Sequence, residues 1–201
     1  TFNNVYKDSC GAFIRSEIWA CIAPGCPQIA ARYAYEDGIL DHGKGEGTYG
    51  AVFCAALESA AFVLSDLRQL VDVGLSYIPA ECGVAKAVRC ALACHDQGMG
   101  WIDARDEILR HYRGSSHSGM PDRTSPRDRE KGFAEGQLGY DAPSNVGITV
   151  LGLLYGGDDF DKMITTTVNC GEDTDCTGAT AGATFGIIHG IDAIPHRWIE
   201  P

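Results

Sequence analysis

Two aspartates one residue apart, Asp173 and Asp175, lie directly before a helix-like run that is rich in glycine. They belong to the stretch NCGEDTDCTGATAGATFGIIHG, residues 169–190. Acidic residues are favoured at a helix start, where backbone N–H groups have no partner within the helix, so simple capping is one explanation. Neighbouring carboxylates are also the hard oxygen ligands that Mg²⁺ prefers. The spacing therefore predicts either a helix cap or one side of a magnesium site.

Glycines follow the aspartates at every fourth position and would form one stripe along a helix. Each glycine inside a helix costs about 1 kcal/mol relative to alanine, so four of them need a reason. We expect this stripe to allow very close approach by another helix. Its members are Gly178, Gly182, Gly186 and Gly190.

Charge and cysteine content limit the possible partners. The chain has 16 basic and 27 acidic residues, a net charge of -11, which excludes a general attraction for nucleic acid. Apolar runs are far too short to span a bilayer, so no membrane partner is expected. Nine cysteines without a CxxC pair favour reduced thiols in a cytoplasmic protein over a disulfide framework. Cys90, Cys94 and His95 lack a convincing fourth zinc ligand.

The elements that must position these residues form one domain over residues 1–201. Helical spacing predicts helices over 26–40, 47–75, 85–98 and 103–112, with a break inside the second and Asp103 as the N-cap of the last. Residues 113–143 are polar and rich in glycine and proline, which predicts a long loop that is either functional or disordered. Residue preferences alone indicate strands over 146–154 and 163–168.

Several stretches together resemble the ADP-ribosylglycohydrolase family. The most specific is GEDTDCTGATAGATFGIIHG followed by AIPHRW, which is similar to the family's C-terminal signature. SNVGITVLGLLYGGDDF resembles its asparagine-then-apolar helix, and residues 14–51 resemble its middle section. The resemblance implies an all-α orthogonal helical bundle, and this replaces the strands indicated by residue preference.

The resemblance also implies a site of two Mg²⁺ ions that grips the ribose hydroxyls of ADP-ribose. Asp173 and Asp175 would be both catalytic residues and metal ligands, and Cys176 occupies a position where many relatives carry a metal-binding threonine. A thiol is a poor magnesium ligand, so Thr177 or a backbone oxygen is the alternative to Cys176.

Four further residues match family positions that contact the ligand. Ser9 and Gly11 lie in a short SCG loop, which is uninformative on its own. His42 precedes the glycine-rich GKGEGTYG turn, whose amides would either cradle a diphosphate or simply form a flexible turn. Asn145 would either bind substrate or cap a helix.

The implied activity is hydrolysis of the bond between ADP-ribose and a modified protein residue or a small molecule. Family members carry a further acidic motif that completes the metal site, and nothing equivalent precedes SCGAFIRSEIW. We therefore expect the C-terminal part of a longer protein, holding about half of the metal site and inactive without the N-terminal segment. The alternative is a family member that has lost catalysis and serves as an ADP-ribose-binding or structural module.

Overall fold

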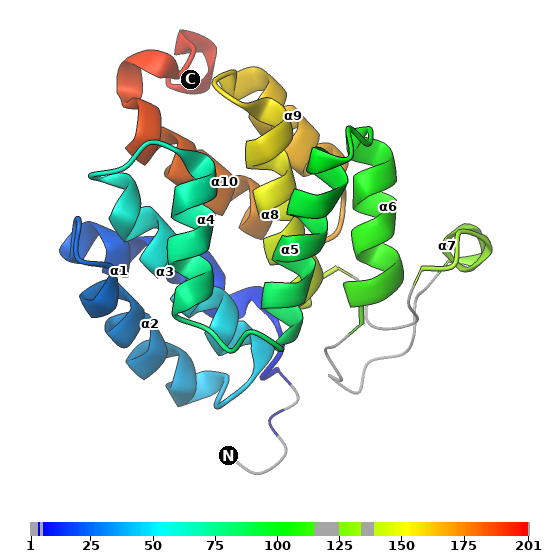
Figure 1. Cartoon of the computed structure of the whole chain (residues 1–201), viewed down its shortest axis with the longest axis horizontal. Coiled ribbons are helices and arrows are strands. Elements are labelled where there is room, and N and C mark those ends of the chain that lie inside the picture. Colours follow the sequence, from blue (N-terminus) through cyan, green and yellow to red (C-terminus); the bar gives the residue numbers. More distant parts are fainter. Residues whose placement is uncertain (1–3, 5, 115–124, 134–138, 201) are drawn as a thin grey trace.

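The computed structural model describes residues 4, 6–114, 125–133 and 139–200. Over these ranges the chain contains ten α-helices and no strand, so the all-α prediction is confirmed (Figure 1). The helices are α1 (Glu17–Ile22), α2 (Pro27–Asp41), α3 (Glu46–Ala61), α4 (Leu67–Ser76), α5 (Gly83–Asp96), α6 (Trp101–Tyr112), α7 (Pro126–Glu130), α8 (Ala142–Gly156), α9 (Phe160–Asn169) and α10 (Thr174–His189). Short 3-10 helices are η1 (Cys10–Arg15), η2 (Ile191–Ala193) and η3 (His196–Trp198).

Two helices that are apolar on nearly every face, α3 and α8, form the centre of the bundle (Figure 1). Helix α3 packs against α1, α2 and α4, whereas α8 packs against α5, α6 and α9. Helix α10 contacts α3, α8, α9 and η1. Its N-terminus, which carries the two aspartates, is therefore held by elements from both halves of the chain.

The two segments that residue preference assigned to strands are helical. Residues 146–154 lie within α8, whose side chains are almost all buried, and burial on every face overrides the β preference of valine and isoleucine. Residues 163–168 lie within α9, where the hydroxyl of Thr167 donates to the carbonyl of Met163 at 2.8 Å. This bond lets a β-branched residue satisfy its polar atom inside a helix.

Helix boundaries follow local capping chemistry. The break expected inside 47–75 is confirmed, because α3 ends at Ala61 and Asp66 caps α4 by accepting a hydrogen bond from the amide of Gln69 at 2.9 Å. The helix predicted over 103–112 is present as α6, but its predicted N-cap is wrong. Its N-cap is Gly100, and Asp103 lies in the first turn, where a carboxylate is also favoured.

The described part of the expected loop 113–143 contains a short helix, α7, that lies apart from the bundle (Figure 1). Ser125 caps it by accepting a hydrogen bond from the amide of Asp128 at 3.1 Å. The remainder of the predicted loop, 115–124 and 134–138, lies outside the described residues.

The glycine stripe of α10 does not bring another helix unusually close, so the expectation of very close approach is wrong. A Cβ built at Gly182 would meet no atom within 4 Å, and one at Gly178 would make ordinary contact with Val168 at 3.4 Å. Close packing occurs instead between α8 and α9, where a Cβ at Gly156 would overlap the backbone of Met163.

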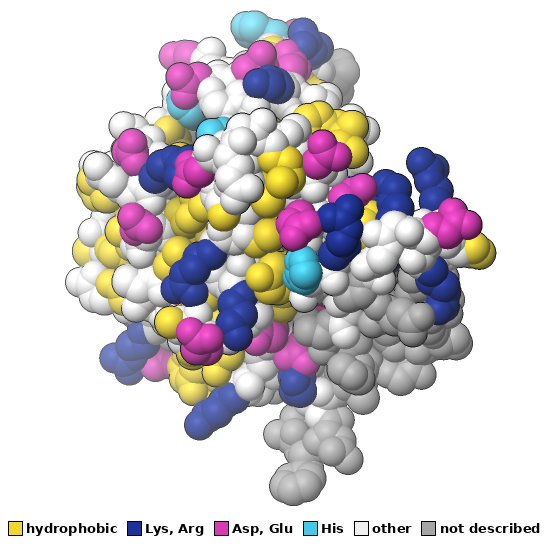
Figure 2. Space-filling view, turned by 45° about the vertical axis from the view of Figure 1, so that its right-hand side comes forward, with side chains coloured by type: hydrophobic (Ala, Val, Ile, Leu, Met, Phe, Trp, Pro, Cys, Tyr) yellow, Lys and Arg dark blue, Asp and Glu magenta, His cyan; other side chains and the backbone are white. Residues whose placement is uncertain are grey.

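The described surface mixes charges of both signs. On the face shown in Figure 2, acidic and basic side chains alternate over the helices. Among the helices that the structure describes, none has both the length and the apolar character needed to cross a membrane.

Helix α3 carries an acidic residue, Glu58, at the centre of the core. Its side chain is 0% exposed, and its Oε1 accepts a hydrogen bond from the Thr184 hydroxyl at 3.1 Å. Its Oε2 has no hydrogen-bond partner among the described residues. Burial, reinforced by the negative charge of nearby Glu17, raises the pKa of Glu58 well above its ordinary value. Glu58 is thus a neutral, hydrogen-bonded core residue at moderate pH.

We expect Glu58→Gln to be more stable than the wild type at alkaline pH. Between the ordinary glutamate pKa and the raised pKa of Glu58, the folded protein holds a proton that the unfolded chain has lost. The contribution of Glu58 to the free energy of unfolding is fully present below the ordinary glutamate pKa. It falls by about 1.4 kcal/mol per pH unit as the pH rises from there to the raised pKa of Glu58. Urea unfolding at several pH values measures the difference. Glu36→Gln, at an exposed position, should follow the wild type, and identical slopes for wild type and Glu58→Gln would contradict the assignment.

We expect alanine to have opposite effects at two helical glycines. Gly182→Ala should raise the free energy of unfolding by about 1 kcal/mol, because the helix gains propensity and the new methyl group meets open space. Gly156→Ala should lower it by roughly 2–3 kcal/mol, because the methyl group would displace the backbone of α9. Chemical denaturation of the two variants tests both signs, and a destabilised Gly182→Ala would restore the close-approach hypothesis.

Candidate functional site

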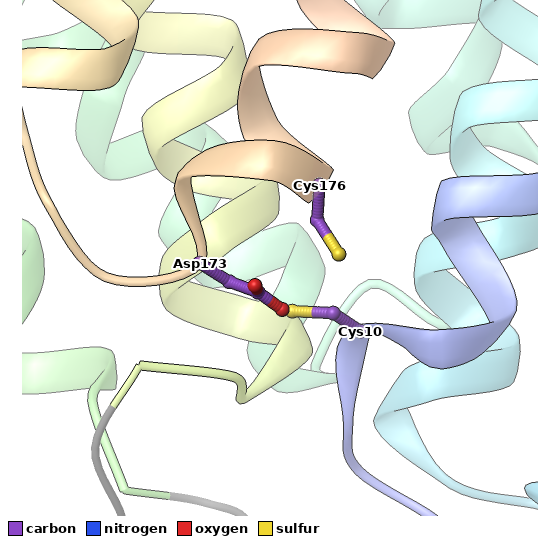
Figure 3. A group of neighbouring side chains, drawn as sticks. All are labelled: Cys10, Asp173 and Cys176. Carbon is purple, nitrogen blue, oxygen red and sulfur yellow. The ribbon is translucent and has the colours of Figure 1, made fainter.

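The side chains of Cys10, Asp173 and Cys176 converge where the start of η1 meets the start of α10 (Figure 3). One ligand-type atom from each, two thiol sulfurs and a carboxylate oxygen, lies within 4.8 Å of the others. Both thiols are buried and Asp173 is half-buried. Asp173 and Cys176 were predicted from the sequence, whereas Cys10 was missed although it lies between two predicted residues.

The carboxylate of Asp173 does not cap the helix on which it lies. Asp173 occupies the N-cap position of α10, but its side chain makes no capping hydrogen bond. Burial raises the pKa of Asp173, and a hydrogen bond shared with Asp175 adds to the effect. The same hydrogen bond lowers the pKa of Asp175, which is exposed. Over the described residues, neither carboxylate forms an ion pair. The capping explanation fails for Asp173, because its side chain accepts no hydrogen bond from the first turn of α10.

The buried thiols belong to the same interacting group. Burial raises the pKa of Cys10 well above its ordinary value, and hydrogen bonding with Cys176 adds to this shift. The amide of Cys10 donates to the carbonyl of Tyr140 at 2.8 Å, which fixes its backbone beside the turn that leads into α8.

A strained turn brings the chain into α10. Glu172 adopts a left-handed backbone conformation with φ of 64°, which is uncommon for a residue other than glycine. Its carboxylate accepts a hydrogen bond from the amide of Gly139 at 3.0 Å and lies 3.3 Å from the guanidinium of the buried Arg113. These contacts hold Asp173, the next residue, at the helix mouth.

Asn145 connects this turn to α8. Its side chain is 0% exposed, and its Oδ1 accepts a hydrogen bond from the amide of Asp173 at 3.0 Å. Its Nδ2 donates to the carbonyls of Gly139 and Asp141, each at 2.9 Å. The N-cap of α8 is Asp141, so the capping alternative for Asn145 is wrong. The geometry gives Asn145 a positioning role toward Asp173, and direct substrate binding by its amide stays a prediction.

The other three predicted binding residues lie together beside Cys10. His42 is buried, with Nε2 at 3.1 Å from the hydroxyl of Ser9 and Nδ1 at 2.7 Å from the carboxylate of Asp41. A Cβ at Gly11 would lie 3.2 Å from the His42 ring. The fold therefore brings Ser9, Gly11 and His42 into one group, and their contact with substrate remains a prediction.

Two amides of the glycine-rich turn after His42 are already hydrogen-bonded within the protein. The amide of Glu46 donates to the Asp8 carboxylate at 2.9 Å, and the amide of Gly47 donates to the Lys7 carbonyl at 3.0 Å. These two donors are therefore not available to cradle a diphosphate.

The donor atoms suit two different kinds of cation. Asp173 and Asp175 offer the carboxylate oxygens that Mg²⁺ prefers. Cys10 and Cys176 offer sulfur atoms, which are poor ligands for Mg²⁺. Cys176 therefore does not fit as a magnesium ligand. Cys90, Cys94 and His95 form no such three-ligand group in the described part of the chain.

The fold is an all-α bundle, and an aspartate pair lies at the start of its last long helix; both features are those expected of an ADP-ribosylglycohydrolase. The chain belongs to the ADP-ribosylglycohydrolase family, whose sequence model matches residues 3–201. Over 52 residues it is 43% identical to the ADP-ribosyl-[dinitrogen reductase] glycohydrolase of Rhodospirillum rubrum, and this alignment covers 26% of the chain and 18% of that protein. The alignment thus spans less than a fifth of this relative. No solved structure gives a significant match.

We expect Asn145→Ala to lower the free energy of unfolding by about 2–3 kcal/mol, because the amide of Asp173 and the carbonyls of Gly139 and Asp141 each lose a hydrogen bond from or to this buried side chain. Urea unfolding measures this effect. Thr165→Ala, which removes an exposed hydroxyl bonded only within its own helix, should change stability by no more than about 0.5 kcal/mol. Equal stability of the Asn145→Ala variant and the wild type would show that the asparagine does not hold the turn.

Proposed function

We propose that this protein takes part in hydrolysis of the glycosidic bond that joins ADP-ribose to a modified protein residue or a small molecule. Two findings support the proposal: membership of the ADP-ribosylglycohydrolase family, and the similarity to the ADP-ribosyl-[dinitrogen reductase] glycohydrolase of Rhodospirillum rubrum. The observation that carries it is the aspartate pair, whose carboxyl groups share a hydrogen bond at the start of α10 without a basic partner among the described residues.

We propose that Asp173 and Asp175 hold Mg²⁺ through their carboxylate oxygens. When bound, the ion would orient ribose hydroxyls and favour ionisation of a water molecule. Two carboxylates from one turn are a partial ligand set, so we propose that further oxygen ligands come from a segment preceding Thr1 in the full-length protein. The described thiols are poor candidates for those positions.

The two carboxyl groups are arranged for different roles. Asp175 is exposed and its pKa is lowered by the hydrogen bond from Asp173, so it is ionised at neutral pH and able to accept a proton from an attacking water molecule. Burial raises the pKa of Asp173, so this group retains a proton more readily. Neighbouring acids whose pKa values are driven apart are typical of an acid–base pair. Because the two groups interact, their titration belongs to the pair.

Ser9, Gly11 and His42 are proposed to contact the ADP-ribose group. Ser9 and Gly11 flank Cys10 in the sequence, and His42 lies against both of them. Cys10 in turn lies beside Asp173. Asn145 would act through Asp173, which it positions by a hydrogen bond to the backbone amide.

We expect Asp175→Asn in the full-length protein to lower the rate of ADP-ribose release by roughly 10²–10⁴-fold, the usual contribution of a general base. Release from proteins that carry N-linked or O-linked ADP-ribose is the assay, and calorimetry with Mg²⁺ should show weakened binding in parallel. Asp158→Asn is the matched control, because this carboxylate is 96% exposed and lies at the opposite end of α10, near His189.

Unchanged turnover in Asp175→Asn would defeat the assignment. Binding of ADP-ribose by the wild-type protein without any turnover would instead favour the alternative, a family member that has lost catalysis.

A further inference from the structure

We propose that Cys10, Asp173 and Cys176 form a binding site for a thiophilic divalent cation such as Zn²⁺. The proposal shares Asp173 with the hydrolytic site but does not depend on hydrolysis. Its basis is the disagreement between the oxygen ligands that Mg²⁺ requires and the two sulfur atoms that the fold places beside Asp173.

The spacing of the three ligand atoms fits a single small ion. They lie within 4.8 Å of one another. Zinc–sulfur bonds of about 2.3 Å in tetrahedral geometry place two sulfur ligands roughly 3.8 Å apart. The three side chains therefore need only small rotations to meet one ion. Three protein ligands also leave a fourth position open, as zinc sites with an exchangeable ligand do.

The ligands are fixed by the backbone before any ion arrives. Cys10 is tied to the carbonyl of Tyr140, and Cys176 lies in the first turn of α10. Asp173 is held by Asn145, and its side chain is directed at the two sulfur atoms rather than at the helix amides (Figure 3). A ligand set held in this way loses little conformational freedom on binding.

The chemistry of the cluster selects a soft cation. Thiolates favour zinc and exclude magnesium and calcium, which take oxygen ligands. Cys10 is 1% exposed and Cys176 is 5% exposed, so two thiolates here would need a compensating positive charge, which a divalent ion supplies. Asp175 lies outside the cluster and is exposed. The mouth of α10 therefore has a sulfur side and an oxygen side with Asp173 between them.

Titration with Co²⁺ tests this proposal. Cobalt reports its own ligands, because tetrahedral thiolate coordination produces intense visible bands and a sulfur-to-cobalt charge-transfer band. We expect both in the reduced wild-type protein at one ion per chain, and displacement of Co²⁺ by Zn²⁺ but not by Mg²⁺. Cys10→Ser and Cys176→Ser should each weaken Co²⁺ and Zn²⁺ binding by about 100-fold or more, since even supporting residues around a metal typically contribute 10–100-fold.

Three variants separate this site from other thiols, from the proposed hydrolysis and from magnesium binding. Cys21→Ser removes an exposed thiol and should leave the cobalt spectrum unchanged. Asp175→Asn should also leave it unchanged while reducing ADP-ribose release, so the two proposals can fail independently. Cys176→Thr should abolish the charge-transfer band without preventing Mg²⁺ binding. Circular dichroism confirms that each variant is folded.

X-ray absorption of the zinc-loaded wild type provides a measurement that needs no variant. Two sulfur neighbours at about 2.3 Å are expected. A shell of oxygen and nitrogen alone would overturn the proposal, as would charge-transfer bands that persist in both serine variants.

Discussion

The hydrogen bond from the amide of Asp173 to the side chain of Asn145 is the contact on which the candidate site depends. It joins the start of α10 to α8, a helix whose almost complete burial leaves it no room to shift. Because the amide is satisfied by a buried side chain, the chain can enter α10 through the strained turn at Glu172. The carboxylate of Asp173 makes no capping hydrogen bond and lies beside the thiols of Cys10 and Cys176.

Charge is distributed unevenly around this contact. Burial, with the negative charge of Glu172 nearby, raises the pKa of Asp141 to about 7. Arg113 is buried here too, and it lies against Glu172 rather than against the aspartate pair. Glu172 is thus partly neutralised within the turn, whereas Asp173 and Asp175 share a hydrogen bond with each other. A site that keeps its acidic groups apart from nearby basic residues leaves them available to a cation or to a proton from water.

Much of the fold followed from sequence patterns, and the errors have physical causes. Helices α2 to α6 were predicted from apolar spacing. The strand indicated over 146–154 was wrong, because the strand preference of single residues takes no account of burial on every face of a helix. The glycine stripe of α10 was misinterpreted because spacing cannot say how closely a neighbouring helix approaches. Cys10 was missed because its partners are distant in sequence, and only the folded chain shows that its thiol faces Asp173 and Cys176.

The meeting of Cys10 with Cys176 has a topological consequence. One residue lies near the first helical turn and the other near the last long helix, so an ion bound by both would close a loop containing most of the chain. Holding the ends of so long a loop together restricts the unfolded ensemble strongly, because the entropy of loop closure grows with the number of residues enclosed. The same two sulfur atoms that would select the metal would then also link the first and last parts of the helical bundle and stabilise its folded state.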